Sequence, residues 1–364
     1  MSVPTPVVPA DVSPLAPPQP APVASSSSSS SWPLGSLYNR FAAWRKSLDL
    51  PNPGTVENLT KESKQTHLNN YAFDGARADL SKSLSMNPMF QVTHAFHLGS
   101  QTAPPTYHFG AMFANDKVLD TLFMHGNVDH DGNLSARFNQ GWSATNVSKI
   151  QAQLSTTPGQ SYVQMEHDFQ GSDYSLNAKA VNPSPADLSG IYMGSYLQSV
   201  TKNLAVGVET ILQRQAPGLS DLGLAYLAKY TGSDRNWIAT AQVQAPGILQ
   251  ASYWQKLSEK VDVAAELQVM AAPGRRDALA TLAARYELRM ASFRAQLDST
   301  GKVSAYLEQR FAPTFAFLVS GEIDHFKNAA KVGVGVMIES SSLTPEEMGM
   351  VPPPGVPAVP LPQP

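Results

Sequence analysis

Acidic side chains recur at alternate positions of many segments, and they are the residues of this sequence best suited to bind a partner by charge. Alternate positions of a β-strand share one face, so these carboxylates are expected to face one common space. The acids assigned to this face are Asp79, Glu166, Asp168, Glu209, Asp262, Glu266, Glu287, Asp298, Glu308, Glu322 and Asp324. They concentrate in the C-terminal third of the chain, so one wall is expected to be acidic. Such a wall would attract cationic segments through weak, dispersed contacts that also permit release.

Basic and apolar residues share this face with the acids. The bases are Arg77, Arg137, Lys149, Lys179, Lys229, Arg285, Arg294, Arg310 and Lys331. Because acids and bases nearly balance, the alternative is that they form cross-strand ion pairs that only solvate the interior. The apolar residues on the same face are Leu227, Ile238, Ile248, Trp254 and Leu318. We interpret them as packing against an inner helix, with a sliding surface for unfolded chains as the alternative.

Enzymatic and metal chemistry find no support in the sequence. There is no cysteine, which removes disulfides and thiolate ligands. His125, Asp129, His130 and Asp131 could suggest a metal site, but the Asp-His-Asp-Gly-Asn run at 129–133 is more simply a hairpin turn. No Gly-x-Ser-x-Gly elbow, phosphate loop or dinucleotide fingerprint occurs. We therefore predict no catalytic residue, no metal and no cofactor.

The elements that position these side chains are predicted to be β-strands. From about residue 70, apolar and polar residues alternate with a period of two, as in 261–269, 293–298, 134–142 and 174–180. Gly, Pro, Asn, Asp and Ser clusters separate the segments. One strand and its turn take about 14 residues, enough for the 9–11 residues of a tilted membrane strand. Residues 70–338 therefore hold about 19 strands.

A membrane barrel explains these strands better than a soluble sandwich or propeller. No segment is apolar throughout, as the centre of a buried core would be, and the polar face carries full charges on strand after strand. Aromatic residues tend to lie at strand ends, where interfacial girdles place them. A closed barrel also pairs every backbone group inside a bilayer. We predict an all-β transmembrane barrel of about 19 antiparallel strands, whose first and last strands pair in parallel because their directions agree.

Both ends of the chain are predicted to lie outside the barrel. Residues 1–32 and 341–364 are rich in Pro and Ser and are expected to be disordered. Residues 33–66 form an N-terminal helical segment, and residues 67–340 form the barrel. Leu37, Phe41 and Trp44 share one face of an amphipathic helix over 33–50. A second helix is expected from Thr55, as the N-cap, to about Lys64.

Composition limits the classes of protein that remain. Charged residues make up 15% of the chain, below the quarter or so that is typical of soluble domains. A net charge of −3 gives no basic face for nucleic acid. The sequence has no apolar run long enough for a transmembrane helix, and no basic residue precedes Arg40 as a secretory signal would require. Any targeting information is expected to be internal.

Three stretches carry a resemblance to a known family. They are residues 52–57 with the downstream 75–79, residues 292–302, and residues 331–338 of the last predicted strand. Together they resemble the pore-forming β-barrel subunit of the translocase of the outer mitochondrial membrane, most of all its fungal members. The resemblance spans about residues 33–340.

The resemblance implies a protein-conducting channel in the mitochondrial outer membrane, with a helix packed inside its pore. It implies that the acidic lumen recognises basic presequences of mitochondrial precursor proteins. It also implies assembly with a single-span receptor subunit, small helical subunits, membrane lipids and a second copy of the barrel, in a homodimer or a higher assembly. No nucleic acid is implied as a partner.

The last strand resembles the sorting signal of mitochondrial barrels, which begins with a polar residue and a glycine and continues with alternating apolar residues. The matching residues here are Lys331, Gly333, Val334, Val336 and Ile338. Such a signal is read by strand addition, in which an exposed edge pairs through its main chain and alternate side chains give specificity. The alternative is that any terminal strand alternates in this way.

Two other functions remain open at this point. A metabolite channel similar to the mitochondrial anion channel would share the architecture, and a soluble all-β binding protein or enzyme would share the alternation of residues.

Overall fold

The computed structural model describes residues 44–341, except 46, 87, 101–103, 118–119, 158, 185–186, 217–218, 246, 273 and 313. The chain divides into two compact units, residues 1–49 and 50–364. In the first unit, Trp44, Arg45 and Ser47 have helical backbone. Leu37, Phe41 and both predicted tails lie outside the described residues, apart from Ser341 at the end of the last strand, so the helix over 33–50 and its place in a pore stay predictions. Among the described helices, none combines the length and apolar character needed to cross a bilayer.

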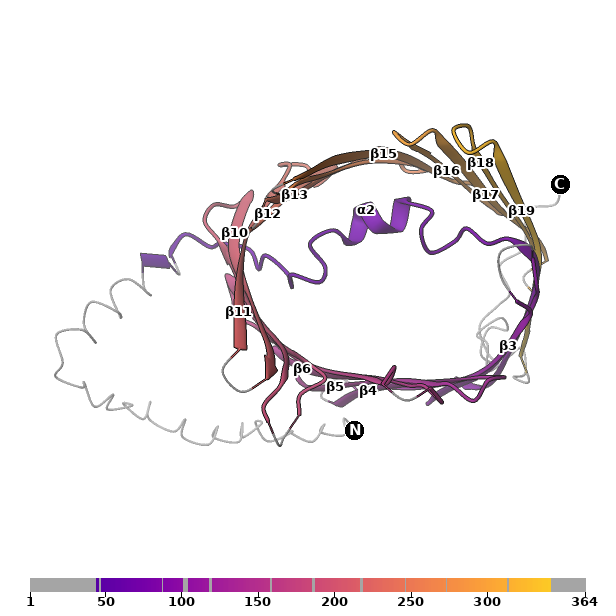
Figure 1. Cartoon of the computed structure of the whole chain (residues 1–364), viewed down its shortest axis with the longest axis horizontal. Coiled ribbons are helices and arrows are strands. Elements are labelled where there is room, and N and C mark those ends of the chain that lie inside the picture. The colour runs from indigo at the N-terminus through magenta and orange to yellow at the C-terminus, as the bar shows by residue number, and fades with distance from the viewer. Residues whose placement is uncertain are drawn as a thin grey trace, which may run out of the picture. The chain divides into compact units, whose positions relative to one another are not determined.

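The second unit is a closed barrel of 19 strands, as predicted (Figure 1). The strands are β1 Gly75–Met86, β2 Met89–Leu98, β3 Thr106–Lys117, β4 Asp120–Asp129, β5 Leu134–Ser143, β6 Asn146–Leu154, β7 Tyr162–Gln170, β8 Tyr174–Val181, β9 Gly190–Ser199, β10 Leu204–Ala216, β11 Leu219–Thr231, β12 Trp237–Gln244, β13 Ile248–Ser258, β14 Val261–Ala272, β15 Arg275–Glu287, β16 Ala291–Asp298, β17 Lys302–Ala312, β18 Phe315–Asp324 and β19 Ala329–Ser341.

Each strand pairs antiparallel with its neighbour along the chain, and β1 pairs in parallel with β19. The parallel register runs from Gly75 opposite Gly333 to Ser83 opposite Ser341. An odd number of up-and-down strands leaves the first and last running the same way, so closure requires this parallel joint. We call it the seam.

The alternation of residues sorts side chains to two faces, as predicted. In β15, Thr281 and Ala283 are 8% and 6% exposed, whereas Leu282 between them is 57% exposed. Aromatic rings also gather on the outer face, where Tyr230 stacks on Trp237 with ring centroids 5.2 Å apart and Trp237 meets Tyr253 at 6.1 Å. The outer face is therefore the apolar one, as contact with lipid requires.

Residues 51–74, which we call the inner segment, run within the barrel before β1 begins (Figure 1). The segment contains the helix α2, Lys61–Thr66, which contacts β13, β14 and β15. The second helix was predicted to start too early. Thr60 holds the N-cap position without a side-chain cap, and Thr55 instead accepts a hydrogen bond from the Asn58 amide. The barrel begins at Gly75 and not at residue 67.

Candidate functional site

The start of the inner segment is held to the barrel wall by hydrogen bonds from side chains to main-chain carbonyl groups. The Asn52 amide donates to the Gly171 carbonyl at 2.6 Å, and the Ser199 hydroxyl donates to the Pro51 carbonyl at 2.7 Å. The Ser175 hydroxyl donates to the Gly54 carbonyl at 2.6 Å. Pro51 and Pro53 favour the extended backbone that exposes these carbonyl groups. These three bonds hold the start of the segment against the ends of β7, β8 and β9.

Two small apolar clusters hold the segment farther along. Leu59 is buried against Leu197, Ala205 and Leu227, and Leu68 is buried with Tyr306 and Leu318. Leu227 and Leu318 therefore pack in clusters that contain both wall residues and residues of the inner segment. Packing of the inward apolar residues against the helix around Phe41 and Trp44 stays a prediction.

A charge cluster joins the segment to the early strands. The Lys149 ammonium lies 2.5 Å from the Glu57 carboxylate, 2.7 Å from that of Asp168 and 3.5 Å from that of Glu166. The Asn177 amide donates to both Glu166 and Asp168. The wall carboxylates are buried, with side chains 5% and 2% exposed. Burial alone would raise the pKa of Glu57, but the hydrogen bond and charge of Lys149 outweigh it and hold that pKa below its ordinary value. We call these residues the Lys149 cluster.

Most of the other predicted lumen acids also have basic neighbours. Asp262 and Glu287 pair with Arg285, Glu308 pairs with Arg310, and Glu322 pairs with Lys302. Asp324 accepts hydrogen bonds from the backbone of the turn at residues 326–327. These pairs match the alternative in which charges solvate the interior.

Besides Asp324, three predicted acids form no ion pair with a Lys or Arg side chain among the described residues. Glu209 accepts a 3.4 Å hydrogen bond from Gln242, Glu266 accepts one of 2.7 Å from Gln250, and Asp298 accepts one of 3.3 Å from Gln296. His67 Nε2 lies 4.0 Å from Glu266, and Lys179 lines the same cavity as Glu209. None of the three carboxylates has a close Lys or Arg partner in this part of the chain, so each can still attract a cation.

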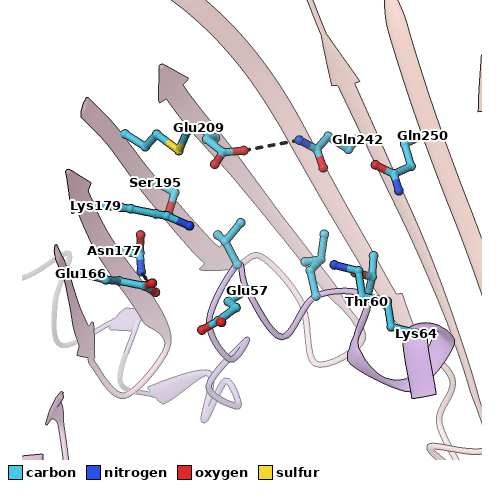
Figure 2. Close-up of a pocket in the computed structure, with 13 residues that line it drawn as sticks. Glu57, Thr60, Lys64, Glu166, Asn177, Lys179, Ser195, Glu209, Gln242 and Gln250 are labelled. Atoms are coloured by element: carbon cyan, nitrogen blue, oxygen red, sulfur yellow. Dashed lines mark hydrogen bonds between the residues drawn. The ribbon is translucent and has the colours of Figure 1, made fainter. Parts of the chain in front are cut away.

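Glu209 faces a cavity of about 230 Å³ between the inner segment and the wall. Figure 2 shows Glu57, Thr60 and Lys64 on the segment side, facing wall residues that include Ser195, Glu209 and Gln242. The Ser195 hydroxyl is buried and has no hydrogen-bond partner among the described residues. The lining also includes Lys64 and Lys179, so the cavity combines acidic and basic side chains with the Ser195 hydroxyl.

The predicted signal residues of β19 divide between the two faces of the barrel. Lys331 lies opposite Glu322, and Gly333 lies opposite Ser320, both on the lumen face. Val334, Val336 and Ile338 alternate with them and lie on the outer face, where Val334 is 43% and Ile338 is 40% exposed. The apolar half of the motif therefore faces lipid.

The run 129–133 forms the β4–β5 hairpin turn, as predicted, with Gly132 at φ 79°. The two ring nitrogens of His130 point to different carboxylates, Nδ1 to Asp129 at 2.7 Å and Nε2 to Asp131 at 3.4 Å. The hydrogen bond to Asp129 raises the pKa of His130 above its ordinary value. These contacts stabilise the turn.

The outer face carries an apolar groove over β3 to β6. Its floor is a row of small residues in register, Ala111, Gly126, Ala136 and Ala152. The adjacent row, two residues along each strand, is large and apolar, and it comprises Phe113, Met124, Phe138 and Ile150. The groove encloses about 350 Å³, and a Cβ atom added to Gly126 would meet open space.

Sequence reasoning did not find the role of residues 51–74. The segment has neither a strand period nor a long helical period, so periodicity gave no signal for it. Glu57 could be recognised only from the stretch Asn-Pro-Gly-Thr-Val-Glu at 52–57 that carried part of the resemblance, and no sequence signal pointed to Phe73.

Comparison with known proteins adds direct evidence of ancestry. The sequence model of the eukaryotic porin family matches residues 52–333. The chain is 41% identical to mitochondrial import receptor subunit TOM40 of Saccharomyces cerevisiae, over 94% of each chain. It is 38% identical to the corresponding subunit of Neurospora crassa, over 86% of this chain and 90% of that one. The human homologue is 30% identical over 79% of both chains.

Proposed function

The chain belongs to the eukaryotic porin family, among the TOM40 import subunits, and on this premise we propose that it is the protein-conducting channel of the mitochondrial outer-membrane translocase. The structural observation that supports this proposal is the closed barrel with a polar, charged lumen. An unfolded chain needs a wet passage through the bilayer, and this lumen offers one.

A metabolite channel of the same fold is the second candidate, and the comparisons favour the import channel over it. The fungal relatives named as import subunits match nearly the full chain. We also propose that the chain acts without catalysis, as a conduit for precursor proteins.

We propose that Glu209, Glu266 and Asp298 are the lumen acids that contact basic presequences. Each of them accepts a hydrogen bond from a side-chain amide and forms no ion pair with Lys or Arg among the described residues, while His67 lies 4.0 Å from Glu266. Glu166 and Asp168 are held in the Lys149 cluster, and Asp262, Glu287, Glu308 and Glu322 already have basic partners. A carboxylate without a cationic partner gains more from an arriving cation than one already paired.

The first prediction concerns Glu209. In planar bilayers, the pore is expected to prefer cations and to be blocked by basic presequence peptides. Glu209→Gln is expected to weaken that block by about twofold to fivefold, the range of a single partly solvated ion pair. The measurement is the peptide concentration at half-maximal block.

Glu287→Gln is the matched control, because it removes the same charge from an acid that is already paired with Arg285. It is expected to change the block less than Glu209→Gln does. If both variants weaken the block equally, the total charge of the lumen sets the affinity for the peptide. If the peptides do not block the wild-type pore, the metabolite channel is favoured.

We propose that the outer groove over β3 to β6 receives a single-span helical subunit of the translocase. Helices pack closely in bilayers where small residues let backbones approach, and the floor of the groove is built of Ala and Gly. The large residues along its edge would fix the path of the helix.

The second prediction tests this groove. Ala136→Trp fills its floor and is expected to lower the amount of small helical subunits that copurify with the detergent-solubilised barrel by about fivefold or more. Ala284→Trp is the control, since Ala284 lies on the outer face of β15, outside the groove. Unchanged copurification with Ala136→Trp would exclude the groove as the docking place, and equal losses in both variants would indicate a general packing defect.

A further inference from the structure

The seam is expected to be less stable than the antiparallel pairings of the barrel for two physical reasons. It is the parallel pairing in a sheet whose neighbouring strands are otherwise antiparallel, and parallel ladders are slightly less stable per residue. Its strands also lie at opposite ends of the barrel sequence, so no short turn ties β1 to β19. Something other than local connectivity must keep these edges together.

Phe73 lies over the lumen face of the seam. A Cβ atom on Gly333 would overlap the Phe73 carbonyl oxygen and come within 2.7 Å of its ring. A Cβ atom on Gly335 would lie 3.2 Å from the tip of that ring. The two glycines of β19 therefore leave a notch that the phenylalanine occupies.

Other contacts fix Phe73 to strands on both sides of the seam. Its backbone N–H donates to the Ser320 hydroxyl of β18 at 3.2 Å. Its ring packs against the cluster that contains Tyr306 and Leu318, and the Arg77 guanidinium of β1 lies 5.9 Å from the ring centre. Phe73 is thus held to β18 by its backbone, while its ring lies against β19 and beside Arg77 of β1.

The backbone explains why the ring arrives at this place. Gly75 adopts φ +81°, a conformation that favours glycine, and it opens β1 opposite Gly333. The inner segment therefore turns directly from Phe73 into the first residue of the seam. Because Phe73 lies two residues before Gly75, pairing of β1 with β19 places the Phe73 ring in the notch.

We propose that Gly333 and Gly335 form an intramolecular binding site for the Phe73 ring, and that this aromatic wedge is the positioning residue that holds the seam closed. The glycines of the terminal strand then have a role in the finished barrel, separate from any role in its insertion. The wedge links the placement of the inner segment to closure of the barrel, because the segment ends at the point where β1 pairs with β19.

Hydrogen–deuterium exchange of the purified complex in lipid nanodiscs tests the proposal. Phe73→Gly is expected to raise the exchange rates of amides in residues 75–86 and 329–341 about tenfold or more, because loss of a packed aromatic side chain frees the joint that it covers. Exchange in the β10–β11 hairpin is expected to stay unchanged. Phe73→Leu keeps an apolar side chain and is expected to give a smaller rise at the same amides.

Leu59→Gly is the matched control, since Leu59 anchors the inner segment in the other cluster, away from the seam. It is expected to leave exchange at the seam as in the wild type. Unchanged seam exchange in Phe73→Gly, or an equal rise in Leu59→Gly, would overturn the proposal. If Phe73→Gly does not assemble, Phe73→Leu decides, and wild-type exchange at its seam would count as the same refutation.

Discussion

Replacing Lys149 with methionine is expected to destabilise the barrel by about 3–5 kcal/mol, the cost of leaving buried charges without their partner. The Lys149 ammonium is the cation that contacts both Glu166 and Asp168, whose side chains are almost fully buried, and it is itself only 18% exposed. Methionine keeps much of the volume but supplies no charge. The measurement is thermal unfolding of the purified barrel in detergent, followed by tryptophan fluorescence.

The matched control removes the charges together. Lys149→Met combined with Glu166→Gln and Asp168→Asn replaces the buried ions by neutral groups of similar shape, so most of the lost stability is expected to return. Glu57 is about half exposed and can be solvated by water. If the triple variant is as unstable as Lys149→Met alone, the Lys149 cluster stabilises the barrel through packing rather than through charge compensation.

Val336→Asp is expected to reduce assembly of the barrel into the native complex by about tenfold or more. Val336 lies in the middle of β19 on the lipid-facing side, so a carboxylate there both enters the bilayer and interrupts the apolar half of the proposed sorting signal. Assembly is measured by importing radiolabelled chain into isolated mitochondria and separating the products on native gels. Combining this change with Gly333→Leu is expected to abolish assembly.

Leu282→Asp provides the comparison for that experiment. Leu282 also lies on the outer face, within β15, and is 57% exposed, so its replacement places the same charge in lipid but outside the terminal strand. A terminal-strand signal predicts that Val336→Asp stalls earlier, before the chain engages the insertion machinery. If both variants are arrested at the same step, the assembly defect of Val336→Asp reflects the cost of placing a charge in the bilayer and not the loss of a sorting signal. Gly333→Leu alone is not informative here, because a side chain at that position also displaces Phe73.

Much of the fold follows from local alternation along the chain. The period of two assigns each side chain to one of two faces whatever strand lies beside it, and this is why Thr281 and Leu282 could be placed inside and outside from sequence. Strand length and turn spacing gave the number of strands, and the odd number required a parallel seam. The contacts of the inner segment with the wall could not be predicted. Residues 51–74 have no period of two, and they contact strands more than 100 residues away.

The amino-acid sequence by itself determined the barrel, its apolar and polar faces and the acids that can enter the lumen. Only the tertiary structure decided that Glu166 and Asp168 form ion pairs with Lys149 whereas Glu209 accepts a hydrogen bond from Gln242, and that Phe73 occupies the space above Gly333. The physical reason is that the face of a side chain depends on its own position in a strand. Its partner depends on the register of neighbouring strands and on the path of a segment that meets them only after the barrel closes.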